Sequence, residues 1–332
     1  MFKICVIGCG GIADGFHLPA IKKYCDVNPG AVMQACCDID MEKARTAAEK
    51  FGCGAYYDDY VKMLCAENPD AVCLLVSYNV ISQIAVDIIS KGFPLLIEKP
   101  PGSTADEVKA IINAAEKSGV HNQIAFNRRF TPMVSELKSF LNKYPSPIHN
   151  IRCVFHRVNR KDNDFYTTAI HGIDTVRYIA GSDYKQINFR YQELADVNDG
   201  AANIYLDCVM ESGAAAQLSF CPCAGKVTED YFVTCKGSEY SLKMPVWGSL
   251  EYPGKVQQYI NNEYSEEIYD GGDRFGTEMF EKFGFYWENA DFFDNVRYKK
   301  PSANDIKSAL QSVEVAHCIH KREKSYNKNG GC

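Results

Sequence analysis

The residues best suited to chemistry include a lysine at the end of an apolar segment. Residues 95–97 are an apolar run typical of a buried strand, and Glu98 and Lys99 follow it directly, ahead of two prolines at 100–101. Partial burial lowers the pKa of a lysine, so an amine held at a strand end could bind a hydroxyl group and help to remove its proton. A solvated surface pair of Glu98 and Lys99 is the alternative interpretation.

A glycine-rich turn near the start of the chain could bind phosphate. The sequence GCGGIA fits the G-x-G-x-x-G/A pattern with Gly8, Gly10 and Ala13, and Gly11 and Ile12 lie between the last two. Gly8 permits a tight turn, Gly10 lets the backbone approach a pyrophosphate, and Ala13 permits close packing of helix on strand. Because the turn follows an apolar strand and opens a helix, its N–H groups could bind dinucleotide phosphates. A turn without a ligand is the alternative.

An acidic residue at the end of the second apolar strand indicates which dinucleotide is bound. Asp38 lies there and is followed by Ile39. A carboxylate at this position accepts hydrogen bonds from both adenosine ribose hydroxyls and repels a 2′-phosphate. We therefore predict NAD as the cofactor, in preference to NADP. The alternative is that Asp38 caps the following helix, and one carboxylate could do both.

These residues need a sheet that brings the ends of several strands to one edge. Residues 1–125 alternate apolar strands with helices, which predicts an α/β Rossmann-type doubly wound parallel sheet and an NAD-binding domain. Thr104 followed by Glu107 predicts a capping box. The expected strands are 2–8, 31–38, 55–57, 71–77, 94–99 and 121–126, and the expected helices are 11–24, 41–52, 58–66, 80–92 and 104–119.

The pattern changes after residue 125. Alternating strands with polar turns predict that residues 126–332 form an α+β domain with a large, mostly antiparallel open sheet. Its exposed apolar face requires cover, so we expect a homodimer or homotetramer formed through this C-terminal sheet. The last residues, 326–332, are expected to fray. The expected strands are 148–158, 185–193, 201–210, 214–221, 229–235 and 239–243, and the expected helices are 132–143, 168–181, 276–297 and 304–322.

Four motifs together resemble the Gfo/Idh/MocA oxidoreductases, which include glucose–fructose oxidoreductase and inositol dehydrogenases. They are GCGGIA near the start, EKP at 98–100, NRRFTP at 127–132 and HGID at 171–174, and the resemblance covers nearly the whole chain. It implies an NAD(P)-dependent oxidoreductase that interconverts a hydroxyl and a carbonyl on a sugar, polyol, cyclitol or sugar derivative. It also implies a cis peptide before Pro100, which would fix the direction of Lys99.

The resemblance implies two catalytic residues. Lys99 would bind and polarise the reacting oxygen beside the nicotinamide, and His171 would act as general acid and base. The residue four positions before His171 is Thr167, where the family often has aspartate. Thr167 could hydrogen-bond a substrate but could not orient an imidazole as a carboxylate would. Asp164 or Tyr166 could take over that task.

Further residues match the family by position. Ser77, Tyr78 and Asn79 lie where the family commonly shows Thr-Pro-Asn, which contacts the nicotinamide ribose and pyrophosphate. We expect Arg129 to make an interdomain ion pair and His17 to pack or to position a helix. The predicted cofactor-binding residues are Gly8, Gly10, Gly11, Ile12, Ala13, Asp38, Ser77, Tyr78, Asn79, Glu98, Lys99 and Asn127. The predicted substrate-binding residues are Lys99, Arg128, Tyr166, Thr167 and His171, with Arg157 and Arg160 as candidates by position. Asp174 is expected to be structural and to bond the adjacent backbone.

Composition argues against several other classes of protein. The net charge is −6 and neither predicted domain is basic, so no nucleic-acid partner is expected. No apolar run approaches the roughly 20 residues needed to cross a bilayer, so no membrane association is expected. Fifteen cysteines without a CxxC pair predict buried thiols in a reducing cytoplasm, and no metal site is expected.

Two other functions fit the same resemblance. One is a catalytically inactive dinucleotide-binding sensor or regulator, which the Thr167 departure favours. The other is a redox-neutral lyase or glycosidase-like enzyme that retains NAD.

Overall fold

The computed structural model describes residues 1–161 and 165–330, which form two compact units. The first unit combines Met1–Asn127 with Glu278–Val313, and the second combines Arg128–Thr277 with Glu314–Cys332. The expected division after residue 125 therefore falls close to the first crossing. The expected second domain, 126–332, ran unbroken to the end of the chain. In the structure, Glu278–Val313 belongs to the first unit.

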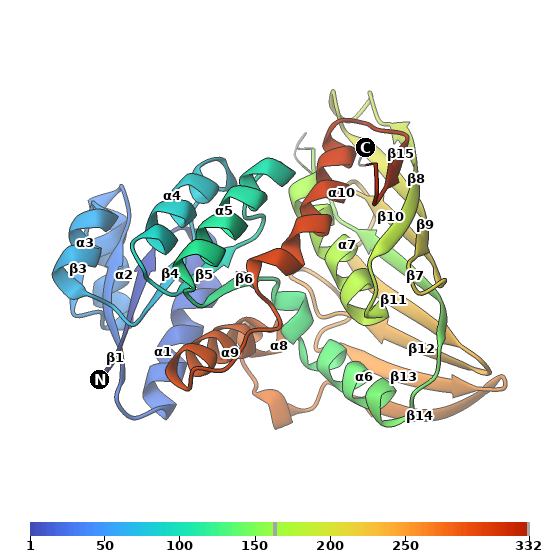
Figure 1. Ribbon diagram of the computed structural model, residues 1–332. Helices are drawn as coiled ribbons and strands as arrows, with labels where there is room; N and C mark the ends of the chain where they lie inside the picture. The colour runs from blue at the N-terminus through green and yellow to red at the C-terminus, as the bar shows by residue number, and fades with distance from the viewer. Residues whose placement is uncertain (162–164, 331–332) are drawn as a thin grey trace. The chain divides into compact units, whose positions relative to one another are not determined.

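The first unit is built on a parallel sheet whose strand order is β3-β2-β1-β4-β5-β6 (Figure 1). The predicted Rossmann-type topology is confirmed. The order reverses between β1 and β4, and ligands of such sheets bind beyond the carboxyl ends of the strands at this point. The strands are β1 (Phe2–Ile7), β2 (Ala31–Cys37), β3 (Ala55–Tyr57), β4 (Ala71–Leu74), β5 (Leu95–Glu98) and β6 (Asn122–Ala125). The helices between them are the π-helical turn η1 (Ala13–His17), α1 (Leu18–Val27), α2 (Met41–Phe51), α3 (Tyr60–Glu67), α4 (Tyr78–Ser90) and α5 (Ala105–Ser118).

Local signals explain where these helices begin. Thr104 Oγ1 accepts a hydrogen bond from the N–H of Glu107, and the Glu107 carboxylate accepts one from the N–H of Thr104, so the predicted capping box is confirmed. Pro19 lies in the first turn of α1, where its missing N–H costs nothing. It therefore begins a helix after the π-helical turn, and does not interrupt one that runs from residue 11.

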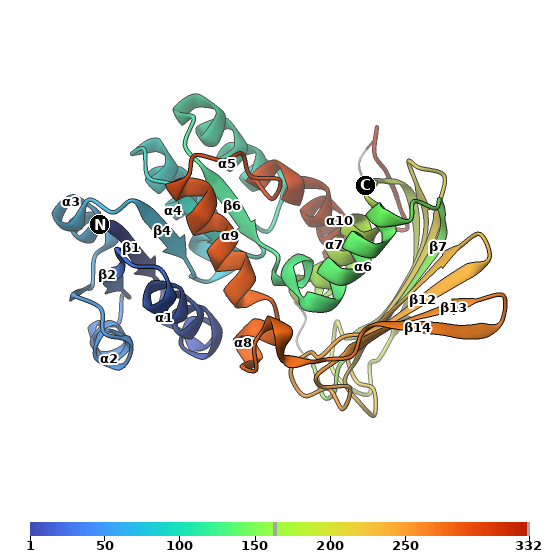
Figure 2. The same cartoon turned by 90° about the horizontal axis from the view of Figure 1, so that it is seen from below.

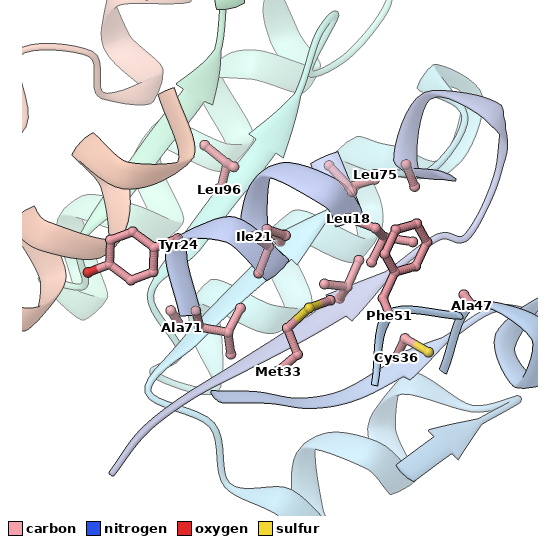
Figure 3. Packing of buried hydrophobic residues seen from close by; sticks show 14 of the residues in the cluster. Leu18, Ile21, Tyr24, Met33, Cys36, Ala47, Phe51, Ala71, Leu75 and Leu96 are labelled. Atoms are coloured by element: carbon pink, nitrogen blue, oxygen red, sulfur yellow. The ribbon is translucent and has the colours of Figure 1, made fainter. Parts of the chain in front are cut away.

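One face of the parallel sheet is covered by α1, α2 and α9, and their apolar side chains form a single buried cluster. Figure 3 shows Leu18 and Ile21 of α1 in the same layer as Phe51 of α2 and Met33 of β2. Cys36 lies in this layer as a buried thiol. Each of these larger apolar side chains contributes roughly 1.5–3 kcal/mol when it is buried.

The segment that returns to the first unit is held there by aromatic side chains. Phe292 and Phe293 are fully buried in the same cluster, and the hydroxyl of Tyr24 donates to Asp294 across 2.7 Å. Figure 2 shows α9 beside α1. The expected single helix over 276–297 is divided into α8 (Met279–Lys282) and α9 (Phe285–Arg297), because Gly284 adopts a φ of 89° that a helix cannot continue. The segment continues with η4 (Ile306–Ala309) and then α10 (Leu310–His320).

The second unit contains a broad sheet with the order β14-β13-β12-β11-β7-β10-β9-β8-β15. All neighbours pair antiparallel except β7 and β10, which confirms the predicted mostly antiparallel sheet. Helices α6 (Pro132–Lys143) and α7 (Tyr166–Ala180) lie along one face (Figure 2). The strands are β7 (Ile148–His156), β8 (Tyr184–Glu193), β9 (Ala202–Met210), β10 (Ala215–Cys221), β11 (Thr228–Cys235), β12 (Ser238–Lys243), β13 (Lys255–Ile260), β14 (Glu263–Tyr269) and β15 (Ser325–Asn327), and the short helices are η2 (Asn127–Phe130) and η3 (Asp273–Phe275).

Three strands were not expected. β13 and β14 form a hairpin whose turn residues Asn261 and Asn262 both have positive φ, and most side chains of β14 are exposed. An edge strand with two wet faces has no apolar alternation by which to predict it. The end of the chain was expected to fray from residue 326, but Tyr326 is buried in β15, which pairs with β8.

Candidate functional site

The glycine-rich turn follows β1 at the point where the strand order reverses. Gly8 has a φ of 98°, and a Cβ at this position would lie 2.4 Å from the carbonyl oxygen of Leu75, which follows β4. The N–H of Gly8 also donates to Cys37 O across 2.8 Å. Only glycine fits both this backbone conformation and this close approach, so the sequence requirement at Gly8 is steric.

The next part of the turn is open. A Cβ placed on Gly10 or on Gly11 would meet no described atom within 4 Å outside its own turn, whereas Ala13 is fully buried against the core. The first N–H groups of a helix have no partner within the helix, and they carry its positive dipole end. An open space over such N–H groups fits the pyrophosphate of a dinucleotide.

Asp38 holds the glycine-rich turn in place. Its Oδ2 accepts a hydrogen bond from the N–H of Cys9 across 2.8 Å, and its Oδ1 accepts one from the N–H of Asp40 across 3.0 Å. The residue that caps α2 is Asp40, whose Oδ1 accepts from Glu42 N–H, so the alternative of Asp38 as the helix cap is wrong. Ile39 beside it is 96% exposed. An exposed apolar side chain next to this carboxylate provides a surface on which an adenine ring could rest.

The residues after β4 begin the next helix of the first unit. Ser77 is the N-cap residue of α4 and Tyr78 is its first residue. Ser77 and Asn79 are exposed and Tyr78 is half-buried. All three lie at the carboxyl edge of the sheet, where the sequence predicted cofactor contacts.

Glu98 and His17 form a buried polar contact at the end of β5. His17 Nε2 lies 3.5 Å from Glu98 Oε1, and Nδ1 on the other side of the ring lies 3.1 Å from Asn289 Nδ2 in α9. Both His17 and Glu98 are buried. His17 also packs edge-on against Phe285, as the expected packing role requires, and α9 supplies the Asn289 that the sequence did not reveal.

The other carboxylate oxygen of Glu98 is a candidate contact for a cofactor. Among the described residues, Glu98 Oε2 has no hydrogen-bond partner although it is buried. A buried acceptor left unpaired is costly, so a ligand donor at this position would relieve a real deficit. Together with the open space over Gly10 and Gly11, this orphaned oxygen fits a bound dinucleotide.

Lys99 follows Glu98 at the carboxyl end of the sheet. It is half-buried, and the peptide that joins it to the buried Pro100 is cis, as the resemblance implied. The alternative of a solvated Glu98–Lys99 surface pair does not fit Glu98, which is buried and faces His17.

Asn127, a predicted cofactor contact, bonds the segment that returns to the first unit. Its side chain is buried, and Nδ2 donates to the carbonyl oxygen of Phe283 across 2.8 Å. This bond ties the end of the first stretch of the first unit to the segment that returns at residue 278.

In the second unit, His171 is buried in the second turn of α7. The helix begins at Tyr166, two residues earlier than expected, so Thr167 lies inside its first turn. Tyr166 is buried with its ring 4.7 Å from that of His320, which gives it a packing contact. Asp164, one of the proposed replacements for the family aspartate, lies outside the described residues.

Arg129 fixes α7 to the turn that opens the second unit. Its Nε and Nη2 donate to the two carboxylate oxygens of Asp174 across 2.8 and 2.6 Å, and both side chains are buried. Both partners of this ion pair belong to the second unit, and an interdomain pair for Arg129 stays a prediction. Asp174 is structural as predicted, but its carboxylate bonds this guanidinium, whereas a bond to the adjacent backbone was expected.

A second arginine contact involves a residue that the sequence did not single out. Glu229 in β11 is fully buried and accepts from Arg128 Nε across 3.2 Å, from Arg157 Nη2 across 2.6 Å and from the hydroxyl of Tyr231 across 3.2 Å. Burial alone would raise the pKa of Glu229, but the two guanidinium groups hold it below its ordinary value. Alternation along β11 could have revealed Glu229, since it shares the buried face with Tyr231 and Val233.

Comparisons with known proteins bear on the family. Residues 2–126 match the Gfo/Idh/MocA family model, described as an oxidoreductase family with an NAD-binding Rossmann fold. Inositol 2-dehydrogenase of Salmonella typhimurium strain LT2 is 26% identical over 337 residues, which cover 97% of this chain and 94% of that protein. D-glucoside 3-dehydrogenase of Escherichia coli K12 is 28% identical over 136 residues, 41% of this chain and 38% of that protein.

The chain is therefore similar to the Gfo/Idh/MocA oxidoreductases, and residues 2–126 match the model of that family.

Solved structures show the same fold over nearly the whole chain. Levoglucosan dehydrogenase in complex with NADH superposes with a TM-score of 0.84 at 16% identity and covers 98% of both chains. A Gfo/Idh/MocA family oxidoreductase from Vibrio cholerae gives a TM-score of 0.80 at 21% identity, covering 97% of this chain and 98% of that one. Among the described residues, no helix has the length and apolar character needed to span a membrane.

Proposed function

We propose that this oxidoreductase interconverts a hydroxyl and a carbonyl on a sugar, polyol, cyclitol or sugar derivative, with NAD as its cofactor. The observation that carries the proposal is the position of Lys99, at the carboxyl end of β5 in a unit whose glycine-rich turn and Asp38 fit a dinucleotide. The full-length resemblance to inositol 2-dehydrogenase supports the substrate class.

Lys99 and His171 are the proposed catalytic residues. Lys99 Nζ donates a hydrogen bond to the reacting oxygen and stabilises the negative charge that develops there. The imidazole of His171 takes the hydroxyl proton during oxidation and returns it during reduction. NAD, when bound, accepts the hydride from the carbon that is oxidised.

Asp38 supports the preference for NAD over NADP. Its carboxylate already has an N–H donor on each oxygen, and each oxygen can still accept from a ribose hydroxyl. A 2′-phosphate placed there would face a negative charge. Gly8, Gly10, Gly11, Ile12, Ala13, Ser77, Tyr78, Asn79, Glu98 and Lys99 remain the other proposed cofactor contacts, and Asn127 contributes by holding the returning segment.

The proposal includes an oligomer formed through the face of the sheet that α6 and α7 leave bare. Val209 is 46% exposed on this unit, beside the alternating buried residues of β9. We infer a homodimer or homotetramer, which light scattering coupled to size-exclusion chromatography would detect; a monomer at all concentrations would contradict it. The cytoplasm remains the predicted compartment, and the buried thiols of Cys5, Cys36, Cys37 and Cys73 are compatible with it.

A substrate panel tests the proposal. The protein is mixed with NAD⁺ and a series of inositols, hexoses and glucosides, and NADH absorbance is followed. NADH formation with at least one of these supports the dehydrogenase. Product formation without net reduction would instead indicate the redox-neutral enzyme that retains NAD. Cofactor binding without turnover on any substrate would indicate the sensor.

A further inference from the structure

Three polar side chains of the first unit form a buried chain of contacts: Asn289 of α9, His17 of η1 and Glu98 of β5. Asn289 Nδ2 lies 3.1 Å from His17 Nδ1, and His17 Nε2 lies 3.5 Å from Glu98 Oε1. All three side chains are buried. Because a buried polar network is favourable only when its members are satisfied, each contact in this chain constrains the next one.

Asn289 determines which nitrogen of His17 carries the proton. Its Nδ2 donates to the carbonyl oxygen of Phe285 across 2.7 Å, which fixes the orientation of the amide. The other hydrogen on Nδ2 donates to His17 Nδ1, whereas Asn289 Oδ1 lies farther from that nitrogen, at 3.5 Å. A ring nitrogen that accepts a hydrogen bond carries no proton, so in neutral His17 the proton lies on Nε2 and is donated to Glu98 Oε1.

The imidazole of His17 is also held by packing. Phe285 lies edge-on to it, with the ring centres 5.0 Å apart, and Phe285 is one helical turn before Asn289 in α9. His17 is fully buried at the end of the π-helical turn that follows the glycine-rich turn. The ring can therefore turn only if contacts with α9 are broken, which keeps Nε2 directed at Glu98.

The second oxygen of Glu98 gives this chain of contacts a direction. Oε1 faces His17, and Oε2 is buried without a hydrogen-bond partner among residues 1–161 and 165–330. In the sheet, β5 lies on the β4 side of the reversal in strand order, whereas Asp38 follows β2 on the other side. A dinucleotide binds across this reversal, so with its adenosine at Asp38 its nicotinamide half lies on the side of β4 and β5.

We propose that Asn289 and His17 are positioning residues, which fix the carboxylate of Glu98 so that Oε2 accepts a hydrogen bond from the nicotinamide half of the dinucleotide. That half offers two donors, the carboxamide N–H and the ribose O–H. The proposal rests on the proposed NAD-dependent function and deepens it, since it gives the returning segment a task in cofactor binding. A donor at Oε2 would satisfy a buried acceptor, and this is the source of the affinity.

Fragments of the dinucleotide test this contact without turnover. Calorimetry gives Kd for NAD, its 3-acetylpyridine analogue, ADP-ribose and ADP, with wild type and with Glu98→Leu. The variant should bind NAD roughly tenfold more weakly and should bind ADP, which lacks the nicotinamide half, as wild type does. A loss for NAD alone assigns the carboxamide N–H, which the acetyl analogue lacks, and a shared loss for NAD, the analogue and ADP-ribose assigns the ribose.

Two results would overturn the contact at Glu98. One is an unchanged Kd for NAD in Glu98→Leu, and the other is an equal loss for NAD and ADP, which would place the effect outside the nicotinamide half. If Glu98→Leu does not fold, Glu98→Gln takes its place. Its side chain keeps one acceptor oxygen, which can serve either His17 or the cofactor, so a smaller loss for NAD and none for ADP is expected.

Asn289→Asp tests the positioning role. It puts an acceptor where Nδ1 of His17 needs a donor, so Nδ1 should gain a proton and NAD should bind roughly 3- to 10-fold more weakly. Asn28→Asp is the matched control, since Asn28 Nδ2 also donates to a carbonyl four residues earlier, that of Tyr24, across 2.9 Å. NAD affinity in this control should equal that of wild type. Equal Kd values for Asn289→Asp and wild type would exclude the role of Asn289.

Nitrogen-15 NMR of the histidine rings reports the proton on His17 directly, with the signal assigned by its absence in His17→Leu. We expect a protonated Nε2 and a bare Nδ1 in wild type and in Asn28→Asp, and a protonated Nδ1 in Asn289→Asp. A purely structural contact would not move this proton. A protonated Nδ1 in wild type would contradict the proposed order of donors and acceptors.

The binding data keep this proposal separate from the function on which it rests. If Glu98→Leu weakens NAD but not ADP while no sugar yields NADH with wild type, the contact at Glu98 stands and the dehydrogenase fails. If wild type oxidises a sugar but Glu98→Leu and Asn289→Asp bind NAD as wild type does, the positioning chain is excluded and the dehydrogenase stands.

Discussion

Asp38 of the first unit contacts backbone N–H groups and Glu98 faces His17, whereas Arg128, Arg129 and Arg157 of the second unit are held by buried carboxylates. In the first unit, the position of the glycine-rich turn is set by the φ of Gly8 and by the bond from Cys9 N–H to Asp38. In the second unit, Asp174 and Glu229 determine where the guanidinium groups lie.

The difference shows that similar charged contacts can serve different purposes. Asp174 accepts two hydrogen bonds from the buried Arg129 and lies 3.9 Å from Arg177 Nη1 in its own helix, which suits a contact that fixes α7 in place. The cluster at Glu229 joins β11 to Arg128 and Arg157, whose side chains are 14% and 11% exposed, so it is less completely buried. Substitutions in the two units should therefore produce different losses, and the predictions below run from the largest to the smallest.

The largest loss of stability is expected from breaking the buried contact between Arg129 and Asp174. Arg129→Met leaves Asp174 charged and buried without its two-pronged partner, which should cost about 3–5 kcal/mol of unfolding free energy in urea denaturation. The double variant Arg129→Met with Asp174→Leu should regain much of this, because both charges are then absent. A single variant with wild-type stability would show that the pair does not fix the helix.

A smaller loss is expected at the glycine-rich turn. Gly8→Ala should lower the unfolding free energy by about 1–3 kcal/mol and weaken NAD binding, because its Cβ would meet Leu75 O. Gly52→Ala is the control: Gly52 also has a positive φ, of 77°, but no described atom lies within 4 Å of its Cβ position. Equal effects on NAD binding for both variants would show that the close approach of Gly8 to Leu75 is not the cause of the loss.

Asp38→Ala should separate the two dinucleotides. Loss of the carboxylate releases Cys9 N–H and removes the ribose acceptor, so we expect NAD affinity to fall by roughly tenfold more than NADP affinity. Fluorescence titration with each cofactor measures this directly. Equal losses for NAD and NADP would remove Asp38 from the ribose site and leave it only the role of holding the turn.

The smallest effect is expected in the response to acid. The pKa of Glu229 is lower in the folded protein than in the unfolded chain, so its carboxylate contributes stability above about pH 4.3, and this contribution is lost as the pH falls through the lower folded value. Glu229→Gln should therefore lose less unfolding free energy than wild type between about pH 6 and about pH 3. Parallel pH curves for the two proteins would contradict this.

The sequence predicted the first unit well because its chemistry depends on local rules. Glycine at a tight turn, an acidic residue at a strand end and a lysine before a proline each follow from backbone geometry and spacing. The parallel sheet and the capping box at Thr104 were confirmed for the same reason. The sequence did not predict the contact of Asn289 with His17 or the packing of α9 in the first unit. Both join residues that are far apart in the chain.

The second unit was harder to predict from sequence. Arg128 was selected by position, but Glu229 was not, because the partner of a buried charge can come from any strand of a broad sheet. The polar hairpin of β13 and β14 also gave no apolar pattern. Thr167 lies where the family often has aspartate. Its place in the first turn of α7 does not show which residue orients the imidazole of His171.

The most direct test of the central claim is Lys99→Ala, assayed for NAD binding and for turnover in the same preparation. If Lys99 acts on the reacting oxygen, kcat should fall by roughly 100-fold or more while NAD affinity stays close to that of wild type. A variant that turns over at the wild-type rate, or one that has lost only its NAD affinity, would contradict a catalytic role for this lysine.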